Sequence, residues 1–273
     1  MSSRGYILTF HSQIIHGNDF ATNDHVALDA SLTLLRELRI PVIRLLDVVK
    51  RLRHGDSHRL PSRYACITFD DGPDYDWLDL VHPIHGPQSA MHTILRKHSV
   101  GLWPLWWSRV RATSFVIASS SARADISGDG TNNPDRMHDS WWRVAQNRGL
   151  MDIGNHGWDH VHPSVQGMQG RAHLVEAFHK IDTHDEARLQ IDDAGDCICS
   201  KAGPASGQLF AYPYGQVSDY LADEYLPRQS KLLGAVTTEP APVTGSSDVW
   251  RIPRYVSRDH FKSIADLQAV VEG

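Results

Sequence analysis

Short apolar segments alternate along the chain with longer segments in which apolar residues recur every three or four positions. The short runs are typical of buried strands, and the longer spacing is typical of amphipathic helices. Their alternation predicts βα units around a parallel sheet or barrel. Strands are expected at 6–11, 41–45, 64–69, 112–118, 151–155, 208–213, 234–239 and 250–255. Their number is close to the number of strands in a (β/α) barrel. Helices are expected at 27–39, 45–53, 139–148, 170–194, 217–232 and 262–272.

The domain organisation predicted from the sequence is a single domain over 1–273, because no internal repeat, low-complexity tract or linker divides the chain. The stretch 74–111 is far longer than a typical βα connection. We interpret it as an insertion with its own short helix near 89–97. Its tryptophan-rich segment WPLWW at 103–107 could stack on sugar rings, although packing in a local apolar cluster is the favoured interpretation.

Composition and charge exclude several classes of partner. Apolar residues make up 41% of the chain and charged residues 22%, and the net charge of -5 lacks the basic excess that nucleic acid or an anionic membrane favours. The first apolar stretch is too short for a signal peptide or a membrane span, so we expect a cytoplasmic protein. The cysteines, Cys66, Cys197 and Cys199, are few and odd in number, which fits a reducing compartment. Cys197 and Cys199 lack the usual metal-ligand spacing, and we expect loop thiols.

Two adjacent carboxylates, Asp70 and Asp71, directly follow the strand expected at 64–69. Successive side chains of a strand point to opposite faces, but Gly72 and Pro73 end this strand at once. Both carboxylates can therefore converge at the carboxyl end of the sheet or barrel. Because two ionised carboxylates repel each other, a positive group is expected between them, and a divalent metal is the economical choice.

Histidine pairs of the form H-x3-H supply candidate metal ligands, although with 17 histidines about one such pair is expected by chance. His54 and His58 lie in a basic polar connection, where a solvated loop is the simpler interpretation. His156 and His160 directly follow an apolar strand, and therefore lie at the same type of strand end as Asp71. One carboxylate and two imidazoles would leave coordination positions open, as a catalytic metal requires.

Three short motifs carry a resemblance to a known family. They are TFDDGP (68–73), GNHGWDH (154–160) and FAYPYG (210–215). In this order the chain resembles the NodB-type polysaccharide deacetylases, which are similar to carbohydrate esterase family 4. The resemblance implies a distorted (β/α) barrel, and the order of elements agrees with it from about Tyr6 to Tyr255.

The resemblance also implies a role for each motif residue. Asp70 would be the general base that takes a proton from the water activated by the metal. Asp71, His156 and His160 would hold the metal, with Zn²⁺ the usual ion in the family. The main-chain N–H of Tyr214 would help to hold the oxyanion, so its side chain would matter little for that role.

The chain departs from the family pattern in its third motif and after it. Ala211 stands where the family usually has an arginine that pairs with the catalytic aspartate. Arg254, at the end of a late strand, is the expected replacement, with a surface salt bridge as the alternative. Asp248 and Trp250 are at best a weak match to the family's later aspartate and tryptophan motif.

The general acid is not evident from the motifs, because the family's terminal leucine and histidine signature is absent. His11 follows the first apolar strand and is expected at the same barrel mouth. His260 is a second candidate, late in the chain. A structural role is the alternative for either histidine.

The function expected from these observations is metal-dependent removal of an N-acyl group, above all acetyl, from an amino sugar, glycoconjugate or polysaccharide. The alternatives are hydrolysis of a small non-sugar amide, deformylation included, and a carbohydrate-binding barrel without turnover. The missing motif arginine and the unplaced acid favour a binding protein, whereas the intact Asp70 and metal set favour catalysis. The expected partner is a carbohydrate or another N-acylated substrate, and the sequence predicts no oligomeric state. The insertion at 74–111 follows the first motif and is expected to shape specificity.

Overall fold

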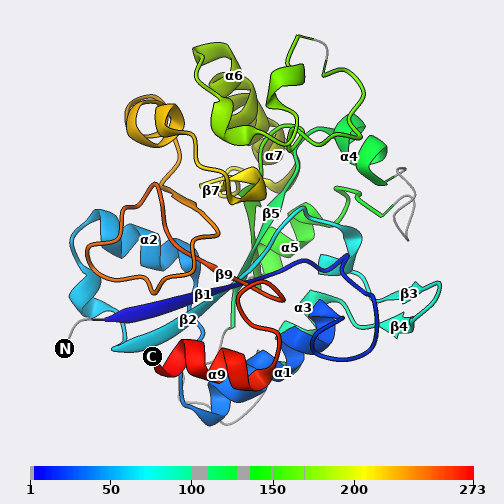
Figure 1. The fold of residues 1–273 in the computed structure, drawn as a ribbon, viewed down its shortest axis with the longest axis vertical. Helices are drawn as coiled ribbons and strands as arrows, with labels where there is room; N and C mark the ends of the chain where they lie inside the picture. The colour runs from blue at the N-terminus through cyan, green and yellow to red at the C-terminus, as the bar shows by residue number, and fades with distance from the viewer. Residues whose placement is uncertain (1–2, 100–109, 128–135, 149, 169) are drawn as a thin grey trace.

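The computed structural model of the protein describes residues 3–99, 110–127, 136–148, 150–168 and 170–273. Within them, seven parallel strands form a sheet that curls into the distorted (β/α) barrel expected from the sequence (Figure 1). The order across the sheet is β8-β7-β6-β5-β2-β1-β9. The strands are β1 (Arg4–Phe10), β2 (Arg63–Phe69), β5 (Ala112–Val116), β6 (Met151–Asn155), β7 (Leu209–Ala211), β8 (Gly234–Val236) and β9 (Tyr255–Val256).

The segment 252–256 connects the two edges of this sheet. Ile252 forms a parallel bridge with Val236 of β8, and three residues later β9 pairs with β1 at the opposite edge. Arg254 lies between these two pairings, and its side chain has no exposed surface. The closure of the barrel therefore encloses a guanidinium group.

The interior of the curled sheet is apolar toward the amino ends of its strands. Ile7, Tyr64 and Cys66 belong to one buried cluster there with apolar residues of the helix α2 (Leu45–Arg53). Figure 1 shows α2 near the amino ends of β1 and β2. The aspartates and histidines of the motifs, in contrast, all follow the carboxyl ends of strands.

Helices cover the outer face of the sheet. Side chains of α1, α3, α5, α7 and α9 share a buried cluster with residues of β1, β2, β5 and β6. Asn23 and Ser263 cap α1 and α9, since each side chain accepts a hydrogen bond from a backbone N–H of the first turn. The helices are α1 (Asp24–Glu37), α3 (Met91–Ser99), α4 (Ser120–Ser127), α5 (Trp142–Arg148), α6 (His184–Arg188), α7 (Ala194–Ala202), α8 (Leu226–Arg228) and α9 (Ile264–Glu272). None of them is both long and apolar enough to cross a membrane.

Two of the predicted elements are wrong. The strand expected at 41–45 is a single bridge between Val42 and Ala65, because the chain turns into α2 at once. The helix expected at 170–194 begins only at His184, after two 3-10 turns. Leu174, Phe178 and Ile181 have the spacing of a helix, but they lie in or directly after the two 3-10 turns. Their side chains belong to a separate buried cluster.

Other predictions differ in extent. The strands expected at 208–213 and 234–239 are reduced to the three residues of β7 and of β8, and the one at 250–255 is interrupted. The helix expected at 217–232 is a π-helical turn, Tyr220–Tyr225, followed by the short α8. Cys197 and Cys199 are free thiols on α7, so the prediction that they lie in a loop is wrong.

The described part of the predicted insertion contains more than its expected helix, which is α3. A hairpin of β3 (Leu80–His82) and β4 (Gly86–Gln88) precedes α3 and was not predicted. Figure 1 shows this hairpin extending from the body of the molecule. The WPLWW segment at 103–107 lies outside the described residues.

Candidate metal and catalytic site

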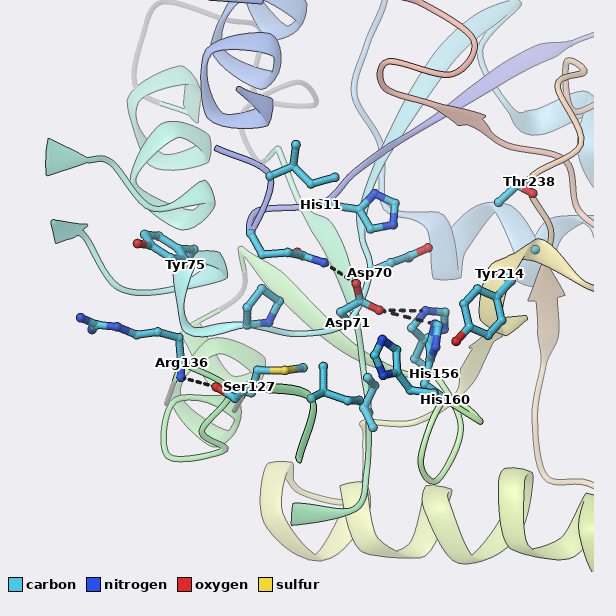
Figure 2. A pocket seen from close by; sticks show the side chains of 18 of the residues that line it. His11, Asp70, Asp71, Tyr75, Ser127, Arg136, His156, His160, Tyr214 and Thr238 are labelled. Carbon is cyan, nitrogen blue, oxygen red and sulfur yellow. Dashed lines mark hydrogen bonds and ion pairs between the residues drawn. The ribbon is translucent and has the colours of Figure 1, made fainter. Parts of the chain in front are cut away.

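The motif residues meet at the carboxyl ends of the strands, around one cavity of about 490 Å³ (Figure 2). The register pairs Phe10 with Phe69, so His11 and Asp70 follow neighbouring strands at the same level. His156 directly follows β6 in the same way. Of the predicted site residues, Arg254 and His260 do not line the cavity, and the others do, namely His11, Asp70, Asp71, His156, His160 and Tyr214.

A left-handed turn lets adjacent aspartates face the same cavity. The backbone N–H of Asp70 still donates to Phe10 of β1, at 3.3 Å, but Asp71 has a φ of 73° and Gly72 a φ of 72°. A Cβ atom on Gly72 would lie 2.5 Å from the side chain of Val116, which is closer than real contacts allow. The motif therefore requires glycine at this position for both conformation and space.

Arg254 binds both carboxylate oxygens of Asp70, at 2.8 Å each. Its Nε also donates to the carbonyl of Thr237 at 2.8 Å, which fixes the plane of the guanidinium. The pair is buried, so it is not the surface salt bridge considered as the alternative. Burial alone would raise the pKa of Asp70, but the charges of Arg254 and His156 and the hydrogen bonds of Arg254 outweigh it and hold the pKa below its ordinary value.

Asp71, His156 and His160 form the cluster predicted as a metal site. The Nε2 atoms of His156 and His160 lie 3.5 Å and 3.6 Å from Oδ1 of Asp71. Gln13 donates a hydrogen bond to the other carboxylate oxygen and so turns Oδ1 toward the imidazoles. Nδ1 of His156 donates to the carbonyl of Ala211 at 2.9 Å, which directs the lone pair of Nε2 toward the cluster.

The geometry of this cluster fits a small divalent ion. One ligand atom from each of the three residues lies within 4.8 Å of the others. Ligand atoms about 2.1 Å from a tetrahedral zinc ion lie about 3.4 Å apart. The two Nε2–Oδ1 distances in this cluster, 3.5 Å and 3.6 Å, are close to that value. Burial and the nearby His156 lower the pKa of His160 to about 3, so its imidazole is neutral, as ligation requires.

The loop that carries both histidines is held by a π-helical turn, Leu189–Asp193, between α6 and α7. The buried side chain of Gln190 in this turn accepts from the N–H of Trp158 at 2.9 Å and donates to Asp159 at 2.7 Å. The loop needs such support because His160 itself has a positive φ of 58°.

His11 and His260, the two candidates for the general acid, differ in position. The ring of His11 faces Asp70 and Asp71 (Figure 2), and its buried Nδ1 has no hydrogen-bond partner within the described residues. His260 does not line the cavity, and its Nδ1 accepts from the N–H of Val256 at 2.8 Å. His260 therefore stabilises a turn after β9.

Tyr214 lies on the other side of the cluster, on the turn after β7. It has a positive φ of 58°, and its ring packs edge to face on His160 with 4.4 Å between centroids. The ring is partly exposed to the cavity, and burial raises its pKa. Asp248 and Trp250, the weak match to the later motif, do not line the cavity. The side chain of Asp248 accepts a hydrogen bond from the backbone N–H of Trp250.

Comparison with known proteins identifies the family. A family model described as polysaccharide deacetylase matches residues 57–227, which is more than half of the chain. The chain belongs to the polysaccharide deacetylase family. The matched region contains the first three motifs but neither His11 nor Arg254. Among curated protein sequences, no match to this family member is found.

Solved structures share the fold of this family member. The deacetylase PplD of Streptococcus pyogenes in complex with acetate has a TM-score of 0.66 at 16% identity, with 100% of both chains covered. A de-N-acetylase from Aggregatibacter actinomycetemcomitans has a TM-score of 0.67 at 14% identity, covering 98% of this chain and 100% of its own. IcaB of Ammonifex degensii has a TM-score of 0.63 at 17% identity, covering 99% and 96%. At these identities the likeness shows the fold.

Three polar residues of the site in this family member were not predicted from sequence. Gln13 bonds to Asp71, Gln190 bonds to the loop that carries the two histidines, and Asp76 is fully buried. Asp76 accepts hydrogen bonds from Ser12 and Ser114, each at 2.6 Å. Burial, opposed by these hydrogen bonds, raises the pKa of Asp76 to about 7. Only Gln13 had a signal in the sequence, since it lies two residues beyond His11 at the same strand end.

Proposed function

We propose that this member of the family is a metal-dependent hydrolase that removes an N-acyl group, above all acetyl, from an amino sugar in a glycoconjugate or polysaccharide. The observation that carries the proposal is the buried Asp70–Arg254 pair beside the cluster of Asp71, His156 and His160. A general base and a set of metal ligands at one cavity are the two parts that hydrolysis of an amide by activated water requires.

Asp71, His156 and His160 are the residues that would hold the metal. A divalent ion bound there would act as a Lewis acid, lowering the pKa of water and polarising the amide carbonyl. The protein's own contribution is to keep the imidazole of His160 neutral, to direct Nε2 of His156 through the carbonyl of Ala211, and to direct Oδ1 of Asp71 through Gln13.

Asp70 would act as the general base. Arg254 holds its carboxylate ionised and in one plane, and the oxygens keep lone pairs that can accept another proton. As the water oxygen forms its bond to the carbonyl carbon, Asp70 takes one proton from the water. The backbone N–H of Tyr214 would donate to the carbonyl oxygen, where negative charge develops.

His11 would complete the reaction as general acid. It faces the aspartates from the end of β1, and its Nδ1 has no competing partner in the described part of the chain. The C–N bond breaks as His11 gives a proton to the leaving nitrogen, which yields a free amine and a carboxylic acid. Return of the proton from Asp70 to His11 restores the starting state.

Two further observations support deacetylation. The family model that matches the chain is that of polysaccharide deacetylases. The Streptococcus pyogenes deacetylase of similar fold was solved with acetate, which is the acid that an N-acetyl group would release.

The test is release of acetate from N-acetylglucosamine oligomers by zinc-loaded protein and by its Asp70→Asn variant. We expect turnover by the native protein, and in the variant its loss with the zinc content unchanged. Asp248→Asn is the matched control, since Asp248 lies outside the cavity. Undiminished turnover by Asp70→Asn would overturn Asp70 as base, and binding of the oligomers without turnover by native protein would favour the non-catalytic barrel.

A further inference from the structure

The cavity of the proposed active site has a second wall that takes no part in the chemistry described above. This wall is aliphatic and comes from the loop after β1, the turn after β2, the end of β5, α4 and the segment that begins at residue 136. Figure 2 shows Ser127 and Arg136 on the opposite side of the Asp71 cluster from Tyr214 and Thr238. The apolar wall consists of Ile14, Pro73, Ile117, Ile126 and Met137.

One buried guanidinium holds this apolar wall in place. Arg123 of α4 is 3% exposed, and its Nη1 donates to the carbonyl of Ile117 at 2.9 Å. Its Nε donates to the carbonyl of Met137, also at 2.9 Å, and Nη2 binds Asp139 at 2.7 Å. Since α4 itself carries Ile126, a single side chain connects three segments of the wall. The wall is therefore formed before a ligand arrives, which lowers the entropy cost of binding.

The chemistry of the apolar wall selects against a hydroxylated group. A sugar hydroxyl buried against Ile117, Ile126 and Met137 would lose its hydrogen bonds to water and find none in return. The hydroxyl of Ser127, beside this wall, already accepts from the backbone N–H of Arg136 at 2.9 Å. Each methylene buried there would instead improve binding by about fourfold.

The size of the cavity leads to the same conclusion. At about 490 Å³ it lies within the range of pockets that enclose whole small molecules. An acetyl group beside the metal ligands would fill only a small part of it. The remaining space adjoins the apolar wall.

We propose that this cavity binds an apolar group of the substrate, an alkyl chain of about four carbons or more, directly beside the reacting amide. This inference rests on the proposed function and narrows its substrate class to amides that carry such a chain. The chain could belong to the acyl group or to the amine, and the chemistry of the wall is the same for both.

Two series of substrates, used with zinc-loaded protein, test the inference and separate the two sources. One series is glucosamine N-acylated with acetyl, butyryl or hexanoyl groups, and the other is N-acetylated methylamine, butylamine or hexylamine. We expect kcat/KM to rise by about fourfold per methylene in one series. The series that shows the rise identifies the side of the amide that faces the wall.

Polar variants of the wall connect this preference to the named residues. Met137→Gln keeps a similar volume, Ile126→Thr keeps the β-branched shape with one heavy atom fewer, and both residues are partly exposed, so folding should tolerate the changes. In each variant the ratio of kcat/KM between the longest and shortest members of the responding series should fall by tenfold or more. Ile84→Thr, on the exposed hairpin outside the cavity, is the control and should keep the native ratio.

A binding measurement supplies a readout that does not depend on turnover. Hexanohydroxamate should bind zinc-loaded protein more tightly than acetohydroxamate, by more than a hundredfold if all four added methylenes are buried. Equal affinities, together with flat kcat/KM in both series and measurable turnover of N-acetylglucosamine, would overturn the apolar subsite and leave the proposed function standing. Absence of turnover and of hydroxamate binding would overturn both.

Discussion

Arg254 donates to both carboxylate oxygens of Asp70 at 2.8 Å, although 184 positions of the chain separate the two residues. The pairing depends on the closure of the barrel, because Arg254 lies between the bridge to β8 and the pairing with β1. Ala211, at the position where the family usually has its arginine, accepts a hydrogen bond from His156 through its backbone carbonyl instead. An arginine from the segment just before β9 thus binds the carboxylate of Asp70.

Replacement of Arg254 by lysine should preserve the charge but not the two parallel hydrogen bonds. We expect a loss of about a hundredfold in kcat/KM, because the orientation of Asp70 is no longer fixed. Since Arg254 holds the pKa of Asp70 low, the acid limb of the pH profile should move to higher pH. Kinetics from pH 4 to 9 check both effects.

Arg251→Lys is the control for this substitution. Arg251 is also an arginine of the late segment, but it is partly exposed and pairs with surface aspartates such as Asp223. An unchanged profile is expected for it. If Arg254→Lys behaved as Arg251→Lys does, the positioning role of Arg254 would be wrong.

Gln190 should control metal affinity without touching the ion. Gln190→Met keeps the volume of the side chain but removes its bonds to Trp158 and Asp159. We expect zinc affinity to fall by about tenfold to a hundredfold, as is usual when the support of a ligand is removed. Competition with a chromophoric chelator measures this affinity.

Ile191→Val, in the same π-helical turn, separates metal affinity from stability. Ile191 is buried, so this variant should lose about 1 kcal/mol of unfolding free energy while its zinc affinity stays native. Equal zinc affinities for Gln190→Met and Ile191→Val would contradict the proposed support of the loop.

Asp76 should make the metal-free protein less stable as the pH rises. Its pKa is about 7 in the folded protein and about 4 in an unfolded chain, so the folded state binds the extra proton between these values. The stability from this group is complete below pH 4 and is lost as the pH rises to 7, by about 4 kcal/mol at most. Denaturant unfolding at pH 4.5 and 7.5 measures the change.

Asp76→Asn should remove most of that pH dependence, because an amide does not titrate and can still bond to the hydroxyls of Ser12 and Ser114. Asp196→Asn, on the exposed side of α7, should keep the native dependence. The same slope in Asp76→Asn and native protein would show that Asp76 is ionised throughout.

His11→Gln should affect the departure of the amine rather than metal binding. We expect kcat to fall by about a hundredfold or more, with the zinc content unchanged. An anilide with a good leaving group should lose much less activity. His260→Gln is the control because His260 bonds within a turn. Equal losses for both kinds of amide would contradict the role of His11 as acid.

The sequence predicts the fold well where polar residues directly follow apolar strands. Asp70, Asp71 and His156 were placed at one cavity because the carboxyl ends of parallel strands share one edge. The hydrophobic pattern predicts the wrong element where apolar residues in turns have helical spacing, as Leu174, Phe178 and Ile181 do in 170–194. These side chains pack against a neighbouring element rather than along one helix.

The sequence does not predict which distant residues support the site. Gln190 acts on the histidine loop from a helix more than 30 positions away, and a glutamine within a helix has no distinguishing pattern. Asp76 lies in a short 3-10 turn, and aspartates are so common in turns that its position does not indicate a buried carboxylate. Each strand of the hairpin of β3 and β4 has only three residues, which is too short for an alternation of apolar and polar residues to predict a strand.

The central claim is that Asp71, His156 and His160 hold a catalytic metal, and metal content tests it most directly. Mass spectrometry should be made on native protein, His156→Ala and His58→Ala, each purified without chelator or histidine tag and reconstituted with zinc. His58 belongs to the other H-x3-H pair, outside the cavity, and serves as the control. The account predicts about one zinc ion per chain in native protein and His58→Ala, and its loss in His156→Ala. Native protein without metal, or equal zinc in all three, would contradict it.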